Sequence, residues 1–427
     1  MGDESPVPGE PPQPESSKHV KIMVSDSRRH TTFPVHHSSF IIHHSPRRIL
    51  QIIPTLDRCG AEKQLTLLAC GLPRREFDLH VCVLTRDGPL RQDLEAAGVH
   101  VTLIGKRWKI DPWAYVRLKR LVAALRPDLI HTWLFAANAY GRRAGVACGV
   151  KCLVAGERCV DSWKGWLHLA IDRRLARRTS RIVANSPGVR DFYVACGLAP
   201  EKLEVIPNGV PPAPPVQTSR GEILAELGLP EEARLAGLVG RLWPQKRVKD
   251  AIWAADLLKV IRRDVYLLVI GDGPHRTRLE TFRDQVEIRD RVLFLGQRED
   301  VPRLLPHFDV LWSASAFEGQ SNAIMEAMAA GIPVVATDIP GTRDLVVHGT
   351  TGYLVPTEGR PVFAPTVNTS VAKGLARYTN VLLDDAALAR RFGQSARRRM
   401  LDEFSVEKMV ARYADLYRRL LEPAGTA

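Results

Sequence analysis

Two glutamates stand eight positions apart in a segment that could bind a sugar or a phosphate. Glu318 lies in a Gly-containing loop after the apolar run 310–312, and Glu326 falls about one turn into a helical pattern that opens near Asn322. Backbone N–H groups at such a helix start can hold phosphate or sugar oxygens, and carboxylates can accept hydrogen bonds from the vicinal hydroxyls of a ribose or hexose. On the spacing alone, an equal alternative is structural: Glu318 caps the helix and Glu326 is exposed on it.

A second candidate group is basic. Arg241 and Lys246 follow the apolar run 234–239 in the sequence GRLWPQKR. Arg offers a planar fork and Lys a point charge to phosphate oxygens, so the pair could hold a diphosphate and stabilise the negative charge of a leaving group. The alternative is a solvated basic helix start, but the position after a predicted strand favours binding.

The elements that must position these residues alternate between strand and helix. Apolar runs of strand length separated by helical patterns are typical of parallel sheets covered on both faces. The rhythm breaks at 206–216 (IPNGVPPAPPV), so the sequence predicts an α/β chain with two doubly wound, Rossmann-like domains and an interdomain cleft, where ligands bind at the strands' carboxyl ends. The expected strands span 49–53, 79–84, 99–104, 129–131, 152–155, 182–184 and 203–206 before this break, and 234–239, 265–270, 292–295, 310–312 and 333–336 after it.

The predicted boundaries follow from composition. Residues 1–46, rich in Pro and then in His, are expected to be a disordered tail or to reflect a start placed too early. Residues 47–207 form the first domain, 208–403 the second, and 404–427 an amphipathic helix and tail. Four histidines of the tail could bind a metal: His36, His37, His43 and His44.

Charge and composition narrow the class of protein. Lys and Arg number 60 against 47 Asp and Glu, which suits an anionic substrate, an anionic membrane surface or nucleic acid. No recognition-helix, zinc-finger or RNP-like pattern supports nucleic acid, whereas the Arg-rich stretch 173–181 is a candidate for peripheral membrane contact. No run approaches the ~18–20 apolar residues of a spanning helix, and the acidic, Pro-rich start is unlike a signal peptide. We therefore expect a cytoplasmic protein, free or on the inner membrane face.

The combined motifs resemble a known family. The E-x7-E spacing, its continuation EAMAAGIPVVATD and the segment VGRLWPQK look like those of retaining glycosyltransferases of the GT-B fold, glycosyltransferase family 4 (glycosyl transferases group 1), over residues 49–421. The resemblance implies an enzyme of class EC 2.4 that moves a sugar from a nucleoside diphosphate sugar to an acceptor hydroxyl. The expected nucleotide of the donor is UDP. It also implies no metal or other cofactor, an acceptor that is lipid-linked or a polysaccharide, and a role in cell-surface polysaccharide or glycolipid synthesis.

The resemblance also implies residue roles. Arg241 and Lys246 would clamp the diphosphate, Glu318 would hold the donor sugar's hydroxyls, Glu326 would hold the ribose, and His131 would touch the donor sugar or acceptor. Attack would be front-face, with the leaving phosphate helping to take the acceptor's proton. The remaining donor positions are Gly240, Gly271, Gly296, Arg298, Val301, Gly319, Gln320, Ser321 and Asn322, and the acceptor side comprises Cys59, Gly60, His131, Ser186 and Arg190.

The sequence departs from the family pattern at three places. Cys59 stands where a Gly is usual, Trp133 stands where many relatives have a second His, and the segment 156–158 lacks a further His, which weakens a His-based proton shuttle. Two other functions stay open. One is an epimerase or phosphorylase of the same fold; the other is a non-catalytic basic protein that binds anionic membrane or nucleic acid.

Overall fold

A computed structural model of the chain describes residues 45–358 and 366–422. The predicted tail, apart from its last two residues, and its four candidate metal-binding histidines therefore lie outside the described residues. Within the described ranges, every strand pairing between named strands is parallel.

The first sheet has seven strands in the order β3-β2-β1-β4-β5-β6-β7. Ile49 of β1 lies opposite Leu79 of β2 on one side and Leu129 of β4 on the other. The strand order reverses between β1 and β4, which is the switch point at which ligands of such sheets bind. The strands span Arg47–Thr55 (β1), Phe77–Arg86 (β2), His100–Leu103 (β3), Leu129–Trp133 (β4), Cys152–Glu157 (β5), Arg181–Ala184 (β6) and Leu203–Val205 (β7).

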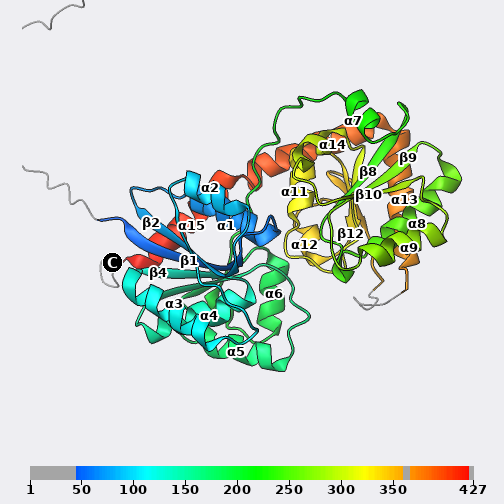
Figure 1. Cartoon of the computed structure of the whole chain (residues 1–427). Coiled ribbons are helices and arrows are strands. Elements are labelled where there is room, and N and C mark those ends of the chain that lie inside the picture. Colours follow the sequence, from blue (N-terminus) through cyan, green and yellow to red (C-terminus); the bar gives the residue numbers. More distant parts are fainter. Residues whose placement is uncertain (1–44, 359–365, 423–427) are drawn as a thin grey trace, which may run out of the picture. The chain divides into compact units, whose positions relative to one another are not determined.

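Helices cover both faces of this sheet (Figure 1). The helices α3, α4 and α5 lie on one face, where Leu118 and Ala144 join a cluster with Leu50 and Ile130. The helices α1 and α2 pack on the other face, which explains why β1 reads as a continuous apolar run. The helices span Gly60–Gly71 (α1), Leu90–Ala96 (α2), Pro112–Leu125 (α3), Leu134–Ala147 (α4), Trp166–Ala176 (α5) and Pro187–Ala195 (α6).

The second sheet has six strands in the order β10-β9-β8-β11-β12-β13, with its switch point between β8 and β11. The strands span Arg234–Val239 (β8), Val265–Ile270 (β9), Val292–Gly296 (β10), Val310–Ser313 (β11), Val334–Thr337 (β12) and Gly352–Val355 (β13). Sequence reasoning missed β13, because this edge strand is four residues long, begins at a glycine and pairs on one side only. The two doubly wound, Rossmann-like sheets confirm the predicted fold class.

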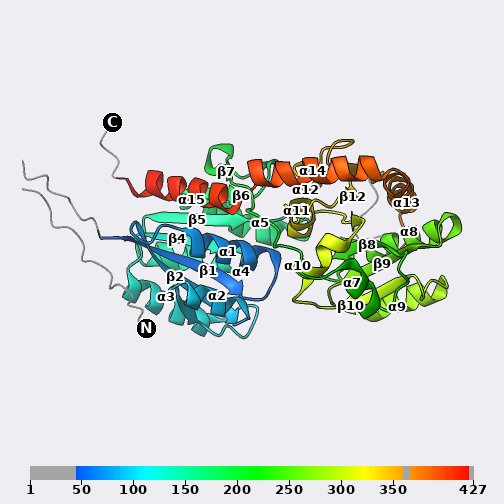
Figure 2. The same ribbon diagram turned by 90° about the horizontal axis from the view of Figure 1, so that it is seen from above.

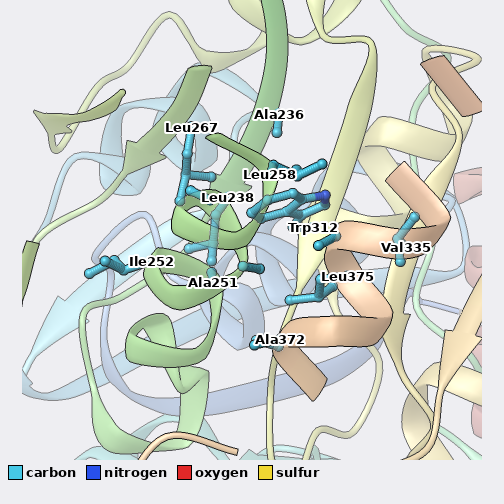
Figure 3. Packing of buried hydrophobic residues seen from close by; sticks show 14 of the residues in the cluster. Ala236, Leu238, Ala251, Ile252, Leu258, Leu267, Trp312, Val335, Ala372 and Leu375 are labelled. Carbon is cyan, nitrogen blue, oxygen red and sulfur yellow. The ribbon is translucent and has the colours of Figure 1, made fainter. Parts of the chain in front are cut away.

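The core of the second sheet is built around Trp312 of β11 (Figure 3). Its ring packs among side chains of β8, β9, α8 and α13, and its Nε1–H donates to Thr379 Oγ1 at 2.7 Å. The buried indole is thereby both packed and hydrogen-bonded. The helices of this part span Arg220–Glu226 (α7), Val248–Ile261 (α8), Arg276–Gln285 (α9), Val301–Leu304 (α10), Asn322–Ala329 (α11), Pro340–Arg343 (α12), Thr369–Asp384 (α13) and Ala386–Glu403 (α14).

The last helix, α15 (Val406–Leu421), returns to the first sheet (Figure 2). Tyr413, Leu416 and Tyr417 are buried in the same cluster as Ile49 and Trp133. The chain therefore passes between the two sheets twice, and the passages are hydrogen-bonded to each other because Val210 N donates to Phe404 O at 2.8 Å. The predicted boundaries at 207/208 and 403/404 fall near these passages and stay predictions.

Thr379→Val tests the hydrogen bond inside the second core. Valine keeps the shape of threonine but leaves the buried indole N–H of Trp312 without its acceptor, so we expect the free energy of unfolding to fall by about 1–3 kcal/mol. Denaturant unfolding measures it. In a Trp312→Phe background the same substitution leaves no indole N–H without an acceptor. The free energy of unfolding should then fall by less than about 0.5 kcal/mol. An equal cost in both backgrounds would show that the hydrogen bond is not responsible.

Candidate functional site

Glycines end three adjacent strands of the second sheet. Gly240 follows β8, Gly271 follows β9 and Gly296 closes β10, and Gly271 N donates to Gly296 O at 2.7 Å. A Cβ on Gly271 would lie 2.1 Å from Gly240 O, and φ at Gly271 is +133°, so only glycine fits there. The strand ends thus carry no side chains, and the backbones of Gly271 and Gly240 pack directly against each other.

The two candidate charged residues that follow β8 and β11 form an ion pair. Lys246, which ends the 3₁₀ turn Pro244–Lys246, pairs with Glu318. Glu318 is nearly buried and also accepts from Ser315 Oγ at 2.7 Å. The structural alternative, in which Glu318 caps α11, is wrong. Ser321 occupies the N-cap position, and no side chain makes a capping hydrogen bond to this helix.

Arg241 occupies a different position from Lys246. Its guanidinium is exposed and lies 4.9 Å from the centre of the Trp243 ring. Gln245, which sequence reasoning missed, donates to Phe317 O at 2.7 Å and lies 3.4 Å from Glu318 Oε2. Gln245 therefore fixes the loop that carries Glu318. Its position next to Lys246 in the sequence is the feature from which it could have been predicted.

The second glutamate pairs with a lysine of the first sheet's α1. Lys63 Nζ lies 2.5 Å from Glu326 Oε1. Glu326 projects from α11, as predicted, about one turn after the helix begins. Lys63 was not among the predicted site residues, although it lies three positions after Gly60. The pair shows that residues after β1 and after β11 meet at one place.

An amide network surrounds this contact. Asn208 N donates to Gln320 Oε1 at 2.8 Å, and Asn208 Nδ2 donates to Asn322 Oδ1 at 2.9 Å. Gln64 exchanges two hydrogen bonds with Gly209, each of 2.8 Å. The side chains of Gln320 and Asn322, predicted to bind the donor, are thus engaged in holding the linker against α1 and α11.

The same region contains a close approach of two backbones. A Cβ on Gly319 would lie 2.0 Å from Arg158 O, so the loop after β11 touches the loop after β5 without any intervening side chain. Asn185 Nδ2 fixes that carbonyl oxygen by donating to it at 3.1 Å. Gly319 is therefore required by packing.

His131 lies in the interior of the first sheet. Its Nδ1 is 2.7 Å from Tyr417 OH, and its ring packs between Trp133 and Tyr413 at centroid distances of 4.7 and 5.5 Å. Burial, followed by the charge of Arg158, holds the pKa of His131 well below its usual range. Arg158 donates to Tyr413 OH at 3.1 Å and also bonds Asn208. His131 is thus fully buried and hydrogen-bonded to α15. Its predicted contact with a sugar or acceptor stays a prediction.

A buried charge cluster holds the loop between β5 and α5. Lys164 Nζ lies 3.1 Å from Glu157, 3.3 Å from Asp161 and 3.0 Å from Asp172. Asp172 also pairs with Arg142 at 2.7 Å. Although burial opposes it, the three carboxylates raise the pKa of Lys164. Sequence reasoning missed this cluster, because its members are spread over 31 positions on separate elements.

The remaining predicted residues lie at helix starts or form ion pairs with neighbouring charged residues. Cys59 precedes α1, and partial burial, with Glu62 and Asp57 nearby, raises the pKa of its thiol. Gly60 O accepts from Asn322 Nδ2 at 3.1 Å. Ser186 caps α6 by accepting from Val189 N at 3.2 Å. The others are Arg190, which pairs with Asp191, Arg298, which pairs with Asp300 and Glu226, and Val301, which begins α10.

Two further features bear on ligands and location. Among the described residues, no group of three or more His, Cys, Asp or Glu side chains is arranged to hold a metal ion. In those same parts of the chain, no helix combines the length and apolarity needed to cross a bilayer.

Both halves of the described chain match known family descriptions. Residues 59–213 match the family "Glycosyltransferase Family 4", and residues 219–399 match "Glycosyl transferases group 1". A 2-deoxystreptamine glucosyltransferase of Streptomyces kanamyceticus is 30% identical over 401 residues, covering 88% of this chain and 98% of the relative. The chain belongs to glycosyltransferase family 4. It is a glycosyltransferase of class EC 2.4 that takes its sugar from a nucleotide sugar, which confirms the predicted enzyme class.

A second relative is also a glycosyltransferase, and two solved structures share the fold. An Escherichia coli UDP-Gal:alpha-D-GlcNAc-diphosphoundecaprenol alpha-1,3-galactosyltransferase is 26% identical over 375 residues, covering 81% of this chain and 90% of the relative. Anabaena HepE, solved with UDP and glucose, superposes with a TM-score of 0.75 at 23% identity over 87% of this chain and all of HepE. The glycosyltransferase WaaG gives a TM-score of 0.65 at 17% identity, covering 86% and 99% of the two chains. These structures support the GT-B fold.

The buried imidazole predicts a specific pH dependence of this family 4 enzyme. Because the pKa of folded His131 lies well below 6.5, the unfolded chain gains a proton below about pH 6.5 that the folded chain does not. His131 therefore lowers the free energy of unfolding by up to about 1.4 kcal/mol for each pH unit below that point, and His131→Asn removes this loss. We expect the stability difference between wild type and variant to shrink from pH 7 to pH 5 in denaturant titrations. A difference independent of pH would contradict the assignment.

Proposed function

We propose that this family 4 enzyme transfers a sugar from a UDP-sugar, with retention of the anomeric configuration, to a hydroxyl of a lipid-linked or polysaccharide acceptor. The observation that carries the proposal is the Lys246–Glu318 pair at the carboxyl ends of β8 and β11, beside strand ends that carry only glycine. A cation for a diphosphate and a carboxylate for sugar hydroxyls thus stand side by side, next to bare backbone.

Donor binding would exchange partners within this site. Lys246 and Arg241 would take the diphosphate oxygens, which frees Glu318 to accept hydrogen bonds from the sugar hydroxyls. Glu326 would take the ribose hydroxyls. Because Lys246 would already lie at the diphosphate once the donor is bound, little reorganisation would be needed when negative charge develops on the leaving UDP. The two cations would thus supply the charge stabilisation that the reaction requires.

The transfer step follows from the same groups. The acceptor hydroxyl would attack the anomeric carbon on the face that the diphosphate leaves, and the departing phosphate oxygen would take the hydroxyl's proton. The bond between the sugar and UDP breaks as the new glycosidic bond forms. The protein's part is to position the reactants and stabilise charge, which agrees with the absence of a hydrogen-bonded His–carboxylate pair among these described site residues.

The comparisons support UDP and a lipid-linked acceptor as the first choices. The E. coli relative is named for UDP-Gal and a diphosphoundecaprenol-linked sugar, and HepE has been solved with UDP and with UDP-glucose. The Streptomyces relative, in contrast, is named for the small acceptor 2-deoxystreptamine. An assay should therefore offer both kinds of acceptor.

Nucleotide binding tests the donor site. Thermal unfolding with UDP, GDP, ADP, dTDP or CMP, without added metal, should show stabilisation by UDP, because a ligand of the folded state at 100 times its Kd adds about 2.7 kcal/mol. Lys246→Ala and Arg241→Ala should remove most of that gain. Lys259→Ala, which changes an exposed lysine on α8, is the control and should keep it. Equal stabilisation of all variants by UDP would overturn the assignment of Arg241 and Lys246.

Turnover separates transfer from the other reactions of the fold. NMR of the product should show a new glycosidic bond with the donor's anomeric configuration. Conversion of the UDP-sugar to an epimer without any acceptor would instead establish an epimerase. Formation of a sugar 1-phosphate from a saccharide and inorganic phosphate, without any UDP-sugar, would establish a phosphorylase.

The Lys63–Glu326 pair gives a second prediction. If Glu326 holds the ribose, Lys63 competes with the donor for this carboxylate. A partly exposed pair of this kind is worth about 0.2–1 kcal/mol, so Lys63→Ala should tighten UDP binding by up to about fivefold in calorimetry. Lys63→Arg keeps the charge and should bind UDP as wild type does. Weaker UDP binding by Lys63→Ala would instead indicate that Lys63 contacts the nucleotide.

A further inference from the structure

The surplus positive charge of the chain is concentrated in one stretch. Residues 101–180 contain sixteen Lys and Arg but five Asp and Glu, a surplus of eleven out of thirteen for the whole chain. Three of the five acidic residues, Asp111, Glu157 and Asp172, are buried. Three basic residues of the stretch, Arg142, Arg158 and Lys164, are buried as well, so its outward surface keeps the whole surplus of positive charge.

This charge lies on the helices of one face of the first sheet. The helices α3, α4 and α5 succeed one another across that face (Figure 1). The predicted Arg-rich stretch is part of it but is not a single helix, because α5 ends at Ala176 and Arg181 begins β6. Exposed cations lie on all three helices and on the loop before α3, including Arg107, Lys109, Lys119, Arg120, Arg143 and Arg174.

Large apolar side chains are exposed on two loop–helix junctions at the carboxyl edge of the same sheet. Ile110, in the loop after β3, is 83% exposed, and Trp113, in the first turn of α3, is 68% exposed. Trp166, which begins α5 after the loop that follows β5, is 81% exposed. Trp108 and Leu167 are exposed beside them. Each junction thus exposes several neighbouring apolar side chains, and exposed apolar patches mark interaction sites.

Hydrogen bonds of a buried residue hold the backbone of the first loop, so its exposed apolar side chains project from a fixed backbone. Asp111 Oδ1 accepts from Ala114 N at 2.9 Å, and Asp111 Oδ2 accepts from Arg107 N at 3.0 Å. Tyr140 of α4 accepts from Asp111 N at 2.7 Å. The buried Asp111 thus holds the loop between β3 and α3, while Trp108, Ile110 and Trp113 on either side of it are exposed.

The second loop is held by the buried charge cluster. Lys164, fully buried among Glu157, Asp161 and Asp172, lies two positions before Trp166. Trp163 packs edge-on against Phe135 of α4 at 5.7 Å. The start of α4 therefore lies against the second loop, and Tyr140 of α4 holds the first, so one helix supports both.

We propose that the surface formed by 107–113, 163–167 and the basic faces of α3, α4 and α5 docks the enzyme on an anionic lipid bilayer. Indole rings favour the membrane–water interface, where an apolar body and a polar N–H are both accommodated. Lys and Arg around them attract anionic headgroups. Ile110 and Leu167 distinguish the bilayer from nucleic acid, which offers stacking to aromatic rings but nothing to aliphatic tips.

This docking surface extends the proposed function, and its biological role rests on that function. It lies on the sheet that carries the predicted acceptor side. A lipid-linked acceptor would thereby be presented to the enzyme in the plane of the membrane. The docking itself needs no donor, so it can be measured separately.

Vesicle flotation of the full chain tests the proposal. We expect binding to vesicles of phosphatidylcholine with 30% phosphatidylglycerol, at least tenfold weaker binding to pure phosphatidylcholine, and strong loss between 0.1 and 0.5 M NaCl. The triple variant Trp108→Ala, Trp113→Ala, Trp166→Ala and the charge variant Lys119→Glu, Arg120→Glu should each bind anionic vesicles at least tenfold more weakly. The double variant Val260→Ser, Ile261→Ser, which removes exposed apolar residues of α8, is the control and should bind as wild type does.

The outcomes distinguish docking from catalysis. UDP-dependent thermal stabilisation should be unchanged in all three variants, which also shows that they are folded; if the triple variant unfolds, the single Trp166→Ala variant replaces it. Wild-type binding by the tryptophan and charge variants, or equal binding to neutral and anionic vesicles, would overturn the docking surface. Binding to a nucleic acid duplex or single strand in preference to anionic vesicles would do the same. Loss of UDP stabilisation in wild type would overturn the proposed function instead.

Discussion

The two passages of the chain between the sheets are bound to each other, and the rest of the site depends on this junction. Val210 N donates to Phe404 O, and the neighbouring Asn208 and Gly209 are held by side chains of α1 and of the loop before α11. A single linker would let the carboxyl edges of the two sheets separate freely. Two linkers tied together restrict their relative motion, which keeps Lys63 within reach of Glu326 and Arg158 beside Gly319.

Both glutamates of the site are paired with lysines. Lys246 holds Glu318 and Lys63 holds Glu326. The first pair spares the nearly buried Glu318 carboxylate the cost of lacking a partner. If the donor binds as we propose, it must replace these interactions, and the measured affinity would then be a difference between two sets of contacts. In the proposed donor complex, specificity would be adjustable through Lys63 or Gln245 without altering any group proposed to touch the sugar.

Much of the fold could be predicted because its signals are local. The apolar runs of β8 and β9 are continuous since both faces of these strands are covered, and the Pro-rich linker marks the passage between the sheets. The position of Glu326 on α11 followed from helical spacing. What escaped prediction arises from contacts between distant residues: β13 is defined by its pairing with β12, and Lys63, Gln64 and the Lys164 cluster acquire their partners only through the tertiary structure. His131 shows the same limit, since its motif indicated a site whereas its burial depends on Tyr413 and Tyr417, nearly 300 positions later.

The return of α15 to the first sheet has a consequence for synthesis. One face of that sheet, lined by Ile49 and Trp133, is completed by Tyr413, Leu416 and Tyr417. A ribosome makes the chain from its N-terminus at roughly 5–20 residues per second, so this face waits uncovered while the whole second sheet is made. The second sheet can complete its own core earlier, because its strands and helices are contiguous in sequence. The half that is made first therefore finishes folding last, and a chaperone that shields apolar surface has its longest task on the first sheet.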